Sequence, residues 1–137
     1  YNMSIQRKRK VSTYLCYSYP KDTIVKKWGF SMEKNLPACP VETTLMLISD
    51  RWKVLILRDL LQGTKRFGEL KKSIGNVSQK VLTANLRSME ESGLLTRKVY
   101  AEVPPRVEYT LTETGYSLKP VLDAMVAWGL EYKKKYD

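Results

Sequence analysis

The chain has 137 residues, a length typical of one domain, with 24 Lys and Arg against 14 Asp and Glu and a formal net charge of +10. Such a charge favours a polyanionic partner. Histidine is absent and cysteine occurs twice, so the commonest general base and metal ligand are missing and no disulfide scaffold is expected. No apolar run reaches the roughly 18 residues of a membrane span. We therefore expect a cytoplasmic protein that is not an enzyme, with no catalytic residue, metal, cofactor or membrane partner.

Residues 1–31 differ in composition from the rest of the chain. They are rich in tyrosine and hold seven basic residues against one acidic residue, or +6 of the net charge, whereas residues 32–137 hold 17 against 13, or +4. The sequence predicts a basic N-terminal extension over 1–31, followed by one domain over 32–137. The extension is either a solvated tail or a segment that contacts phosphate. Alternating residues between Val11 and Tyr19 also allow an edge strand.

The segment Cys39-Pro40-Val41-Glu42 is typical of a helix start, because proline suits the first helical position. Cys39 then occupies the N-cap, where the positive end of the helix dipole favours a thiolate. Glu42 lies nearby and opposes this effect. Two interpretations stay open: a reactive cysteine that senses oxidants or electrophiles, and a half-buried residue with no role.

A further helix is predicted from about Arg51 to Leu61, ending at Gly63. Its apolar residues recur at helical spacing, which favours a core position. The loop that follows carries Lys65 and Arg66, which either contact phosphate or are merely solvated. The predicted core residues of this helix are Trp52, Leu55, Ile56 and Leu60.

The next stretch predicts a helix-turn-helix. A short helix over about Gly68 to Ser73 precedes the turn signal Gly75-Asn76, and Ser78 then opens a second helix. The second helix has two faces. An ordinary helical hairpin with a solvated polar side is the alternative. The expected core stripe is Leu82, Leu86, Met89 and Gly93, and the expected outward face is Lys80, Thr83, Ala84 and Arg87.

After Gly93, which is expected to end that helix, the apolar period changes to two. Two alternating runs, from Thr96 to Val103 and from Arg106 to Leu111, flank Pro104-Pro105. Proline cannot donate ladder hydrogen bonds, so this pair belongs at the tip. The pattern predicts a two-stranded hairpin with an arginine at its tip, which turns the helix-turn-helix into a winged helix.

Thr112 is expected to cap a C-terminal helix that runs towards Lys135, with Pro120 causing a kink or starting a second segment. The apolar stripe of this helix is wider than one small domain can cover. A two-fold dimer through the helix is therefore predicted, with a cap on the chain's own core as the alternative. The predicted interface residues are Leu118, Leu122, Met125, Trp128 and Tyr132.

These motifs, in order and spacing, resemble the HxlR-type bacterial transcriptional regulators over about residues 36–132. The resemblance implies a dimeric winged helix related to the MarR type, which binds operator DNA in the bacterial cytoplasm. It also implies that Cys39 senses oxidants or electrophiles, as in some members. The motifs are Cys39 to Glu42, Asp50 to Lys53, Ile56 to Leu61, Arg66 to Leu70, Ser78 to Thr83, Leu86-Arg87, Gly93-Leu94, Val103 to Tyr109, Thr112 and Gly115.

The predicted fold is mainly α with a small antiparallel β-hairpin, and it dimerises through terminal helices. Its predicted partners are double-stranded DNA, a second copy, and an oxidant or small-molecule effector. A protein–protein interaction module without specific DNA binding is the alternative. The predicted DNA contacts are Ser78, Gln79, Lys80, Thr83 and Arg87 with bases and nearby backbone, Lys65, Arg66, Lys71 and Lys98 with phosphates, and Arg106 with the flanking minor groove.

Overall fold

The computed structural model describes residues 36–137. The predicted N-terminal extension, its boundary at residue 32 and the strand considered between Val11 and Tyr19 lie outside the described residues. The chain divides into two compact units between Met46 and Leu47. Only residues 36–46 of the first unit are described, whereas the second unit is described throughout.

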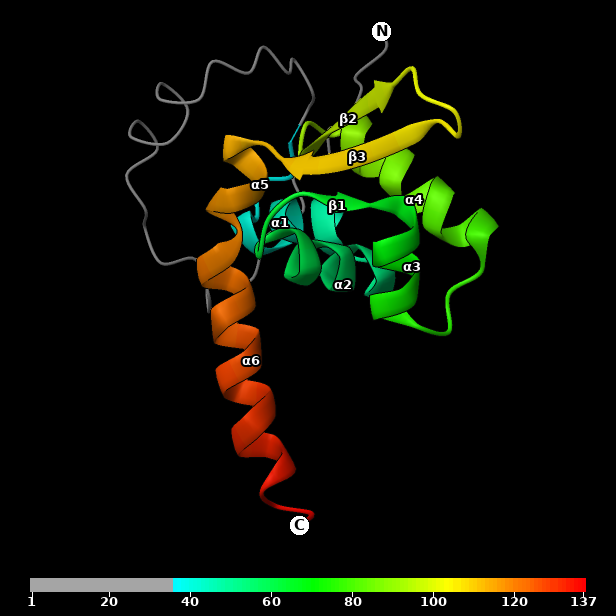
Figure 1. The fold of residues 1–137 in the computed structure, drawn as a ribbon. Coiled ribbons are helices and arrows are strands. Elements are labelled where there is room, and N and C mark those ends of the chain that lie inside the picture. Colours follow the sequence, from blue (N-terminus) through cyan, green and yellow to red (C-terminus); the bar gives the residue numbers. More distant parts are fainter. Residues whose placement is uncertain (1–35) are drawn as a thin grey trace, which may run out of the picture. The chain divides into compact units, whose positions relative to one another are not determined.

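The described chain is mainly helical with one small antiparallel sheet, as the sequence predicts (Figure 1). No helix among residues 36–137 has the length and apolar character needed to cross a bilayer. In chain order the elements are α1 (Pro40–Ile48), α2 (Arg51–Leu60), β1 (Lys65–Arg66), α3 (Phe67–Ile74), α4 (Gln79–Glu91), β2 (Leu95–Tyr100), β3 (Arg106–Leu111), α5 (Glu113–Ser117) and α6 (Lys119–Lys133).

Local side-chain chemistry sets where the helices of the second unit begin. The Asp50 carboxylate caps α2 by accepting from the Trp52 amide at 2.7 Å. The Ser78 hydroxyl caps α4 in the same way, accepting from the Val81 amide at 3.2 Å. The prediction that Ser78 opens the second helix of the helix-turn-helix is thus confirmed.

The end of α4 confirms the predicted glycine stop. Gly93 has a φ of 73°, in the left-handed region that glycine adopts without strain. Its amide donates to the Glu90 carbonyl at 3.0 Å, and the Leu94 amide donates to the Met89 carbonyl at 2.9 Å. These two bonds satisfy carbonyls that the helix leaves free and direct the chain into β2.

The sheet has three strands in the order β1-β3-β2, so the expectation of a two-stranded hairpin was incomplete. Lys65 and Arg66 pair with Tyr109 and Glu108, and the neighbouring Thr64 hydroxyl lies 2.8 Å from the hydroxyl of Thr110. A strand of two residues shows no apolar alternation, and the sequence therefore indicated only a loop there. The predicted proline tip is confirmed, since Pro104 and Pro105 lie between β2 and β3.

The core of the second unit lies where α2 packs against α3, α4 and the sheet. Leu82, Leu86 and Met89 are buried as predicted. In α2, Ile56 and Leu60 are buried as predicted, Trp52 and Leu55 are only partly buried, and Leu57, which was not predicted, is fully buried. Asp59 is buried as well, and it accepts a hydrogen bond from Arg58 Nε at 2.8 Å. A helix covered on several sides buries more than one stripe, and an amphipathic pattern underestimates this.

The C-terminal region forms two helices, and Pro120 lies at the start of α6, which confirms a second segment rather than a continuous helix. The Thr112 hydroxyl caps α5 by accepting from the Gly115 amide at 3.2 Å and donates to the Gly93 carbonyl at 2.5 Å. Thr112 thereby ties the start of α5 to the turn after α4. In Figure 1, α6 runs away from the sheet to the C-terminus.

The residues of the predicted dimer interface, from Leu118 at the N-cap of α6 to Tyr132, differ in burial. Leu118 and Leu122 are only 8% and 6% exposed within the single chain. Both side chains pack into the chain's own core, as in the alternative of an intramolecular cap, and their assignment to an intermolecular surface stays a prediction. Met125, Trp128 and Tyr132 are exposed and stay candidates for that surface.

The outer part of α6 carries an exposed row of aromatic rings. The rings of Trp128 and Tyr132 stack at 4.9 Å, and the Tyr136 ring follows 5.3 Å from Tyr132. The hydroxyls of Tyr132 and Tyr136 lie 3.2 Å apart, and this hydrogen bond raises the pKa of Tyr132 above its usual value. The first two rings are stacked and the third is tilted, and all three residues are exposed.

Candidate nucleic-acid interface

The N-terminal end of α4 is open to solvent. Ser78, Gln79 and Lys80 are all exposed, and the first turn of a helix also has backbone amides that no intrahelical carbonyl satisfies. Such an end attracts negative charge through both its amides and the helix dipole. It can therefore approach the backbone and base edges of a nucleic acid.

Along α4 the outward face matches the prediction in most positions. Lys80, Ala84 and Arg87 are exposed, whereas Thr83 is half-buried. Neither Lys80 nor Arg87 forms an ion pair with another residue in the described part of the chain. The helix therefore presents two uncommitted cations on its solvent side.

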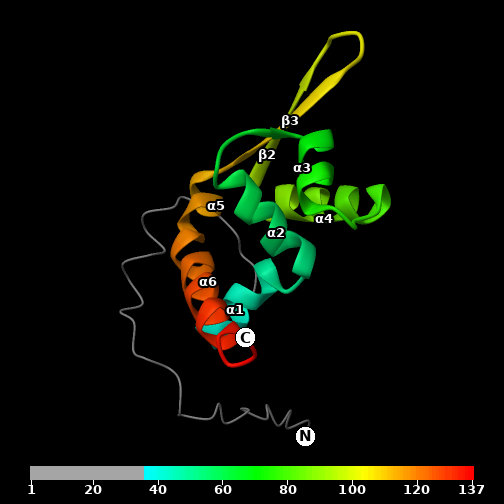
Figure 2. The same ribbon diagram turned by 60° about the horizontal axis from the view of Figure 1, so that its bottom comes forward.

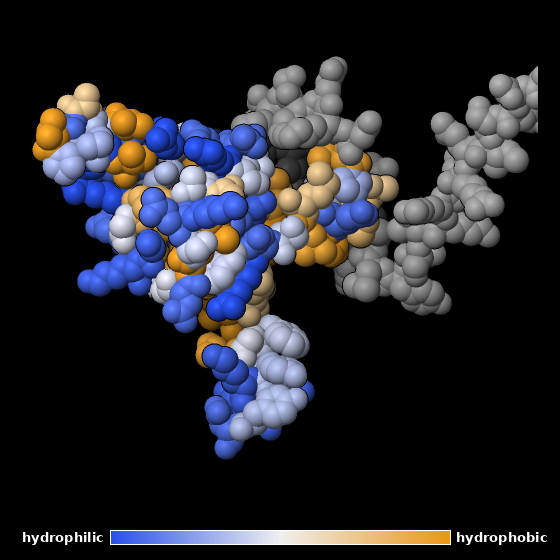
Figure 3. Space-filling view, turned by 90° about the vertical axis from the view of Figure 1, so that its right-hand side faces the viewer, coloured by the Kyte–Doolittle hydropathy of each residue, from blue (hydrophilic) through white to orange (hydrophobic). Residues whose placement is uncertain are grey.

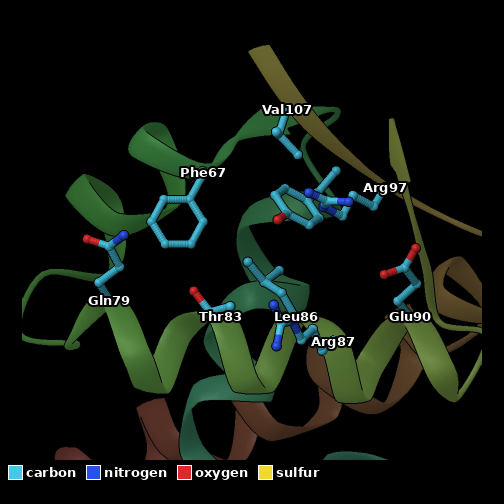
Figure 4. Close-up of a pocket in the computed structure, with 9 residues that line it drawn as sticks. Phe67, Gln79, Thr83, Leu86, Arg87, Glu90, Arg97 and Val107 are labelled. Atoms are coloured by element: carbon cyan, nitrogen blue, oxygen red, sulfur yellow. The ribbon is translucent and has the colours of Figure 1, made fainter. Parts of the chain in front are cut away.

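A groove of about 320 Å³ separates α4 from the sheet. In Figure 4, Thr83 and Leu86 rise from α4 towards the sheet, and Arg97 approaches from β2 on the opposite side. Gln79 lies at one end of the groove and Glu90 at the other. The groove thus has an apolar floor and polar rims, with cations on both the helix and the strand.

Arg106, expected as a free cation at the wing tip, starts β3 and has intramolecular partners. Its guanidinium lies 3.4 Å from Glu102 and 3.4 Å from Glu108, and 4.0 Å from the centre of the Tyr100 ring. Only 27% of its side chain is exposed. To enter a minor groove, Arg106 would have to leave these partners.

Two other predicted phosphate contacts lie near the same carboxylates. Arg66 Nε is 4.0 Å from Glu108, and its backbone amide donates to Glu69 at 2.7 Å. Lys98 pairs with Glu108 across the β2–β3 ladder and lies 4.8 Å from the centre of the Tyr100 ring. Positive charge on this face of the sheet is therefore partly neutralised within the protein.

The remaining predicted phosphate contacts are more separate. Lys65 is half-buried in β1, and Lys71 is exposed on α3. The β2–β3 hairpin extends beyond α3 and α4 (Figure 2). The face that carries α3 and α4 is mostly hydrophilic, and hydrophobic residues mark the tip of the hairpin (Figure 3). Val103 at this tip is fully exposed.

Arg97 is a basic residue on this surface that was not among the contacts predicted from the sequence. It is exposed on β2, lines the groove beside α4, and pairs with Tyr109 across the ladder. The sequence held a signal for this residue. Arg97 directly precedes Lys98 in the predicted strand, so its side chain points to the opposite face of the sheet.

Cys39 lies in the first unit, directly before α1. Its carbonyl accepts from the Thr43 amide at 3.0 Å, which places it at the helix start as predicted. It is a free, half-buried cysteine. Within residues 36–137, no three His, Cys, Asp or Glu residues are grouped in a way that could hold a metal ion.

The comparisons with known proteins agree with this geometry. The profile of the HxlR-like helix-turn-helix family matches residues 47–137. The HTH-type transcriptional regulator YdeP of Bacillus subtilis is 48% identical over 103 residues, which cover 75% of this chain and 80% of YdeP.

Two solved structures are similar as well. The redox regulator HypR in its oxidized form has a TM-score of 0.64 and 42% identity, covering 68% of this chain and 96% of HypR. The reduced transcriptional regulator YodB of B. subtilis has a TM-score of 0.59 and 40% identity, covering 67% of this chain and 91% of YodB. With a helix-turn-helix, a wing and an accessible second helix that carries two unpaired cations, the chain belongs to the HxlR-like helix-turn-helix family of DNA-binding, non-enzymatic transcriptional regulators.

Proposed function

We propose that this regulator acts as a homodimer in the bacterial cytoplasm and binds a near-palindromic operator, with one α4 helix of each protomer in the major groove. The observation that carries the proposal is the solvent-exposed face of α4, where Lys80 and Arg87 have no ion-pair partner in the described part of the chain. Lys80 and Arg87 are unpaired cations on an exposed helix whose N-terminal end is accessible. Such a helix is better suited to bind a DNA duplex than to bind an acidic protein surface.

Pairing of two chains is supported by the outer half of α6. Met125, Trp128 and Tyr132 are exposed there, and a contiguous apolar patch of this kind marks an association surface. A two-fold dimer presents the same α4 face twice. Successive major grooves recur about every 34 Å, so the two half-sites are expected one helical turn, or a multiple of it, apart.

The side chains of α4 suggest how bases are distinguished. Gln79 can form two hydrogen bonds with adenine, and Lys80 or Arg87 can donate to guanine O6 and N7. Lys65 and Lys71 are placed to contact phosphates, which set the register without reading sequence. Ser78 and Thr83 have hydroxyls that can serve either role.

Arg87→Ala tests the base-reading role. Loss of one bidentate contact should cost about 1–3 kcal/mol on the operator and relax the preference at one base pair. Fluorescence anisotropy titrations with operator and random duplexes measure both effects. Lys71→Ala is the control, because loss of a phosphate contact weakens binding to all sequences alike. An equal loss on operator and random DNA for Arg87→Ala would show that Arg87 reads no base.

We further propose that oxidation or alkylation of Cys39 controls DNA affinity. Two similar structures support this proposal. HypR is described as a redox regulator, and YodB is described in a reduced form and after diamide treatment. Cys39 is a free thiol with partial solvent access at a helix start. A modification there would bias a two-state arrangement of the reading helices.

Diamide or quinone treatment tests this control. The operator affinity of the wild type should change by about tenfold, whereas that of Cys39→Ser should stay constant. Cys16→Ser is the matched control and should respond like the wild type. If Cys39→Ser and wild type respond equally, control through Cys39 is excluded.

A further inference from the structure

We propose that Arg97 is the DNA-phosphate contact of the wing, and that Arg106 instead fixes the shape of the wing. This inference rests on the proposed DNA-binding function, and it assigns a contact to a residue outside the predicted set. It also separates two arginines that belong to the same small sheet and carry the same charge.

The two arginines lie on opposite faces of the β2–β3 hairpin. Alternation along a strand places Arg97, Val107 and Tyr109 on one face, and all three line the groove beside α4. Tyr100, Arg106 and Glu108 belong to the other face. Only the first face therefore borders the helix that is proposed to enter the major groove.

Arg106 is poorly suited to a new anionic partner. Its guanidinium is shared between Glu102 and Glu108 and covered by the Tyr100 ring. If it moved to a phosphate, it would leave Glu102 without its cation and Glu108 with only the more distant Arg66, at 4.0 Å. Those carboxylates would then attract counterions, which offsets the counterions released from DNA. The net salt dependence gained from Arg106 is therefore close to zero.

Arg97 has the opposite character. It is exposed, and among residues 36–137 no ion pair or side-chain hydrogen bond occupies it. The floor of the groove beneath it is apolar, formed in part by Leu86 and Val107. Glu90 lines the same groove but forms no ion pair with Arg97, so the guanidinium is available to an anionic ligand.

A DNA backbone explains the arrangement around Arg97. When a helix lies in the major groove, one sugar-phosphate strand passes along its side. Here that side is the groove between α4 and β2, which Thr83 lines from the helix and Arg97 from the strand (Figure 4). A phosphate held between a helix hydroxyl and a strand guanidinium would fix the angle between α4 and the duplex.

Salt-dependent binding of matched variants tests the assignment. Operator affinity is measured from 50 to 200 mM salt for the wild type, Arg97→Ala, Arg97→Lys and Arg106→Ala, in the full chain. Arg97→Ala should weaken binding by roughly tenfold at low salt and lower the salt slope by about 0.9 per protomer. Arg97→Lys keeps the point charge and should keep most of the slope. Arg106→Ala should leave the slope within about 0.5 per protomer of the wild type.

The outcomes separate this inference from the broader proposal. If Arg97→Ala keeps the wild-type slope, or if Arg106→Ala loses as much slope as Arg97→Ala, the assignment is overturned while operator binding stands. If wild type binds operator and random DNA equally but Arg97→Ala still lowers the slope, the phosphate contact stands and operator specificity fails. A wild type that binds no DNA overturns both. Thermal unfolding of each variant shows whether the fold is intact.

Discussion

At the scale of single residues, the sequence predicted which side chains near the DNA-binding surface are cationic, but not which of them have carboxylate partners within the protein. It placed Arg66 in a loop and Lys98 and Arg106 in the wing, whereas the structure places all three residues in one sheet. It did not predict that Glu108 would lie near all three, because cross-strand register brings these groups together. Arg97 was left out for the same reason, since which face of a strand borders α4 is set by tertiary packing.

A second residue-scale effect is the close approach at Gly115. A Cβ there would collide with the carbonyl oxygen of Leu94 and lie 3.0 Å from the Leu111 side chain. Gly115→Ala should therefore lower the free energy of unfolding by about 1–3 kcal/mol, because backbone cannot yield as a flexible side chain does. Chemical denaturation monitored by circular dichroism measures the change.

Gly68→Ala is the matched control for that measurement. A Cβ at Gly68 has no neighbour within 4 Å, and the residue lies in α3. Alanine favours a helix over glycine by up to about 1 kcal/mol, so this variant should be neutral or slightly more stable. Equal stabilities for the two variants would show that Gly115 is not held by close packing.

At the scale of elements, helices were predictable and the smallest strand was not. The start and end of α4 followed from Ser78 and Gly93, whose chemistry is local. The core stripe of α4 also followed from periodicity. β1 has only two residues, and it is a strand only because it pairs with β3. No local sequence pattern could therefore predict it. Pro120 was expected either to kink a C-terminal helix or to start a second segment, and it lies in the first turn of α6, where proline fits.

The charge pattern of α4 leads to a prediction about Glu90. Its carboxylate lines the groove in which a phosphate is proposed to lie. A like charge about 6 Å away in water opposes binding by roughly 0.7 kcal/mol. Glu90→Gln should therefore strengthen binding to operator and random DNA by about threefold each in anisotropy titrations.

Glu91→Gln serves as the control for Glu90→Gln. Glu91 is exposed at the last position of α4 and does not line the groove. Glu91→Gln removes the same charge as Glu90→Gln, and it therefore measures the effect of net charge alone. If Glu91→Gln strengthens binding as much as Glu90→Gln, Glu90 has no special position relative to the phosphate.

At the scale of the whole molecule, the sequence indicated that α6 carries more apolar surface than one domain covers. The structure divides that surface, because Leu118 and Leu122 belong to the chain's own core. Sequence alone could not make this division, since both sets share one helical stripe. The exposed part that remains, around Trp128, is the surface proposed to join two copies.

Trp128→Ala tests this surface. Trp128 is 68% exposed, and its ring stacks on that of Tyr132. Loss of a large aromatic residue from an interface should raise the dimer dissociation constant by at least about tenfold. Sedimentation velocity across a concentration series measures it.

Leu130→Ala is the control, since Leu130 is an exposed apolar residue about 200° around the helix from Trp128. Equal effects would argue against an interface centred on Trp128.

The central claim is that two copies of the exposed α4 face read one duplex together. Selection of bound DNA from a random library by the full chain tests it most directly. The account predicts an enriched near-palindrome whose half-sites lie about 10 base pairs apart, centre to centre, or at a multiple of that spacing. Enrichment of a single unrepeated half-site, or no enrichment over the starting library, would contradict it.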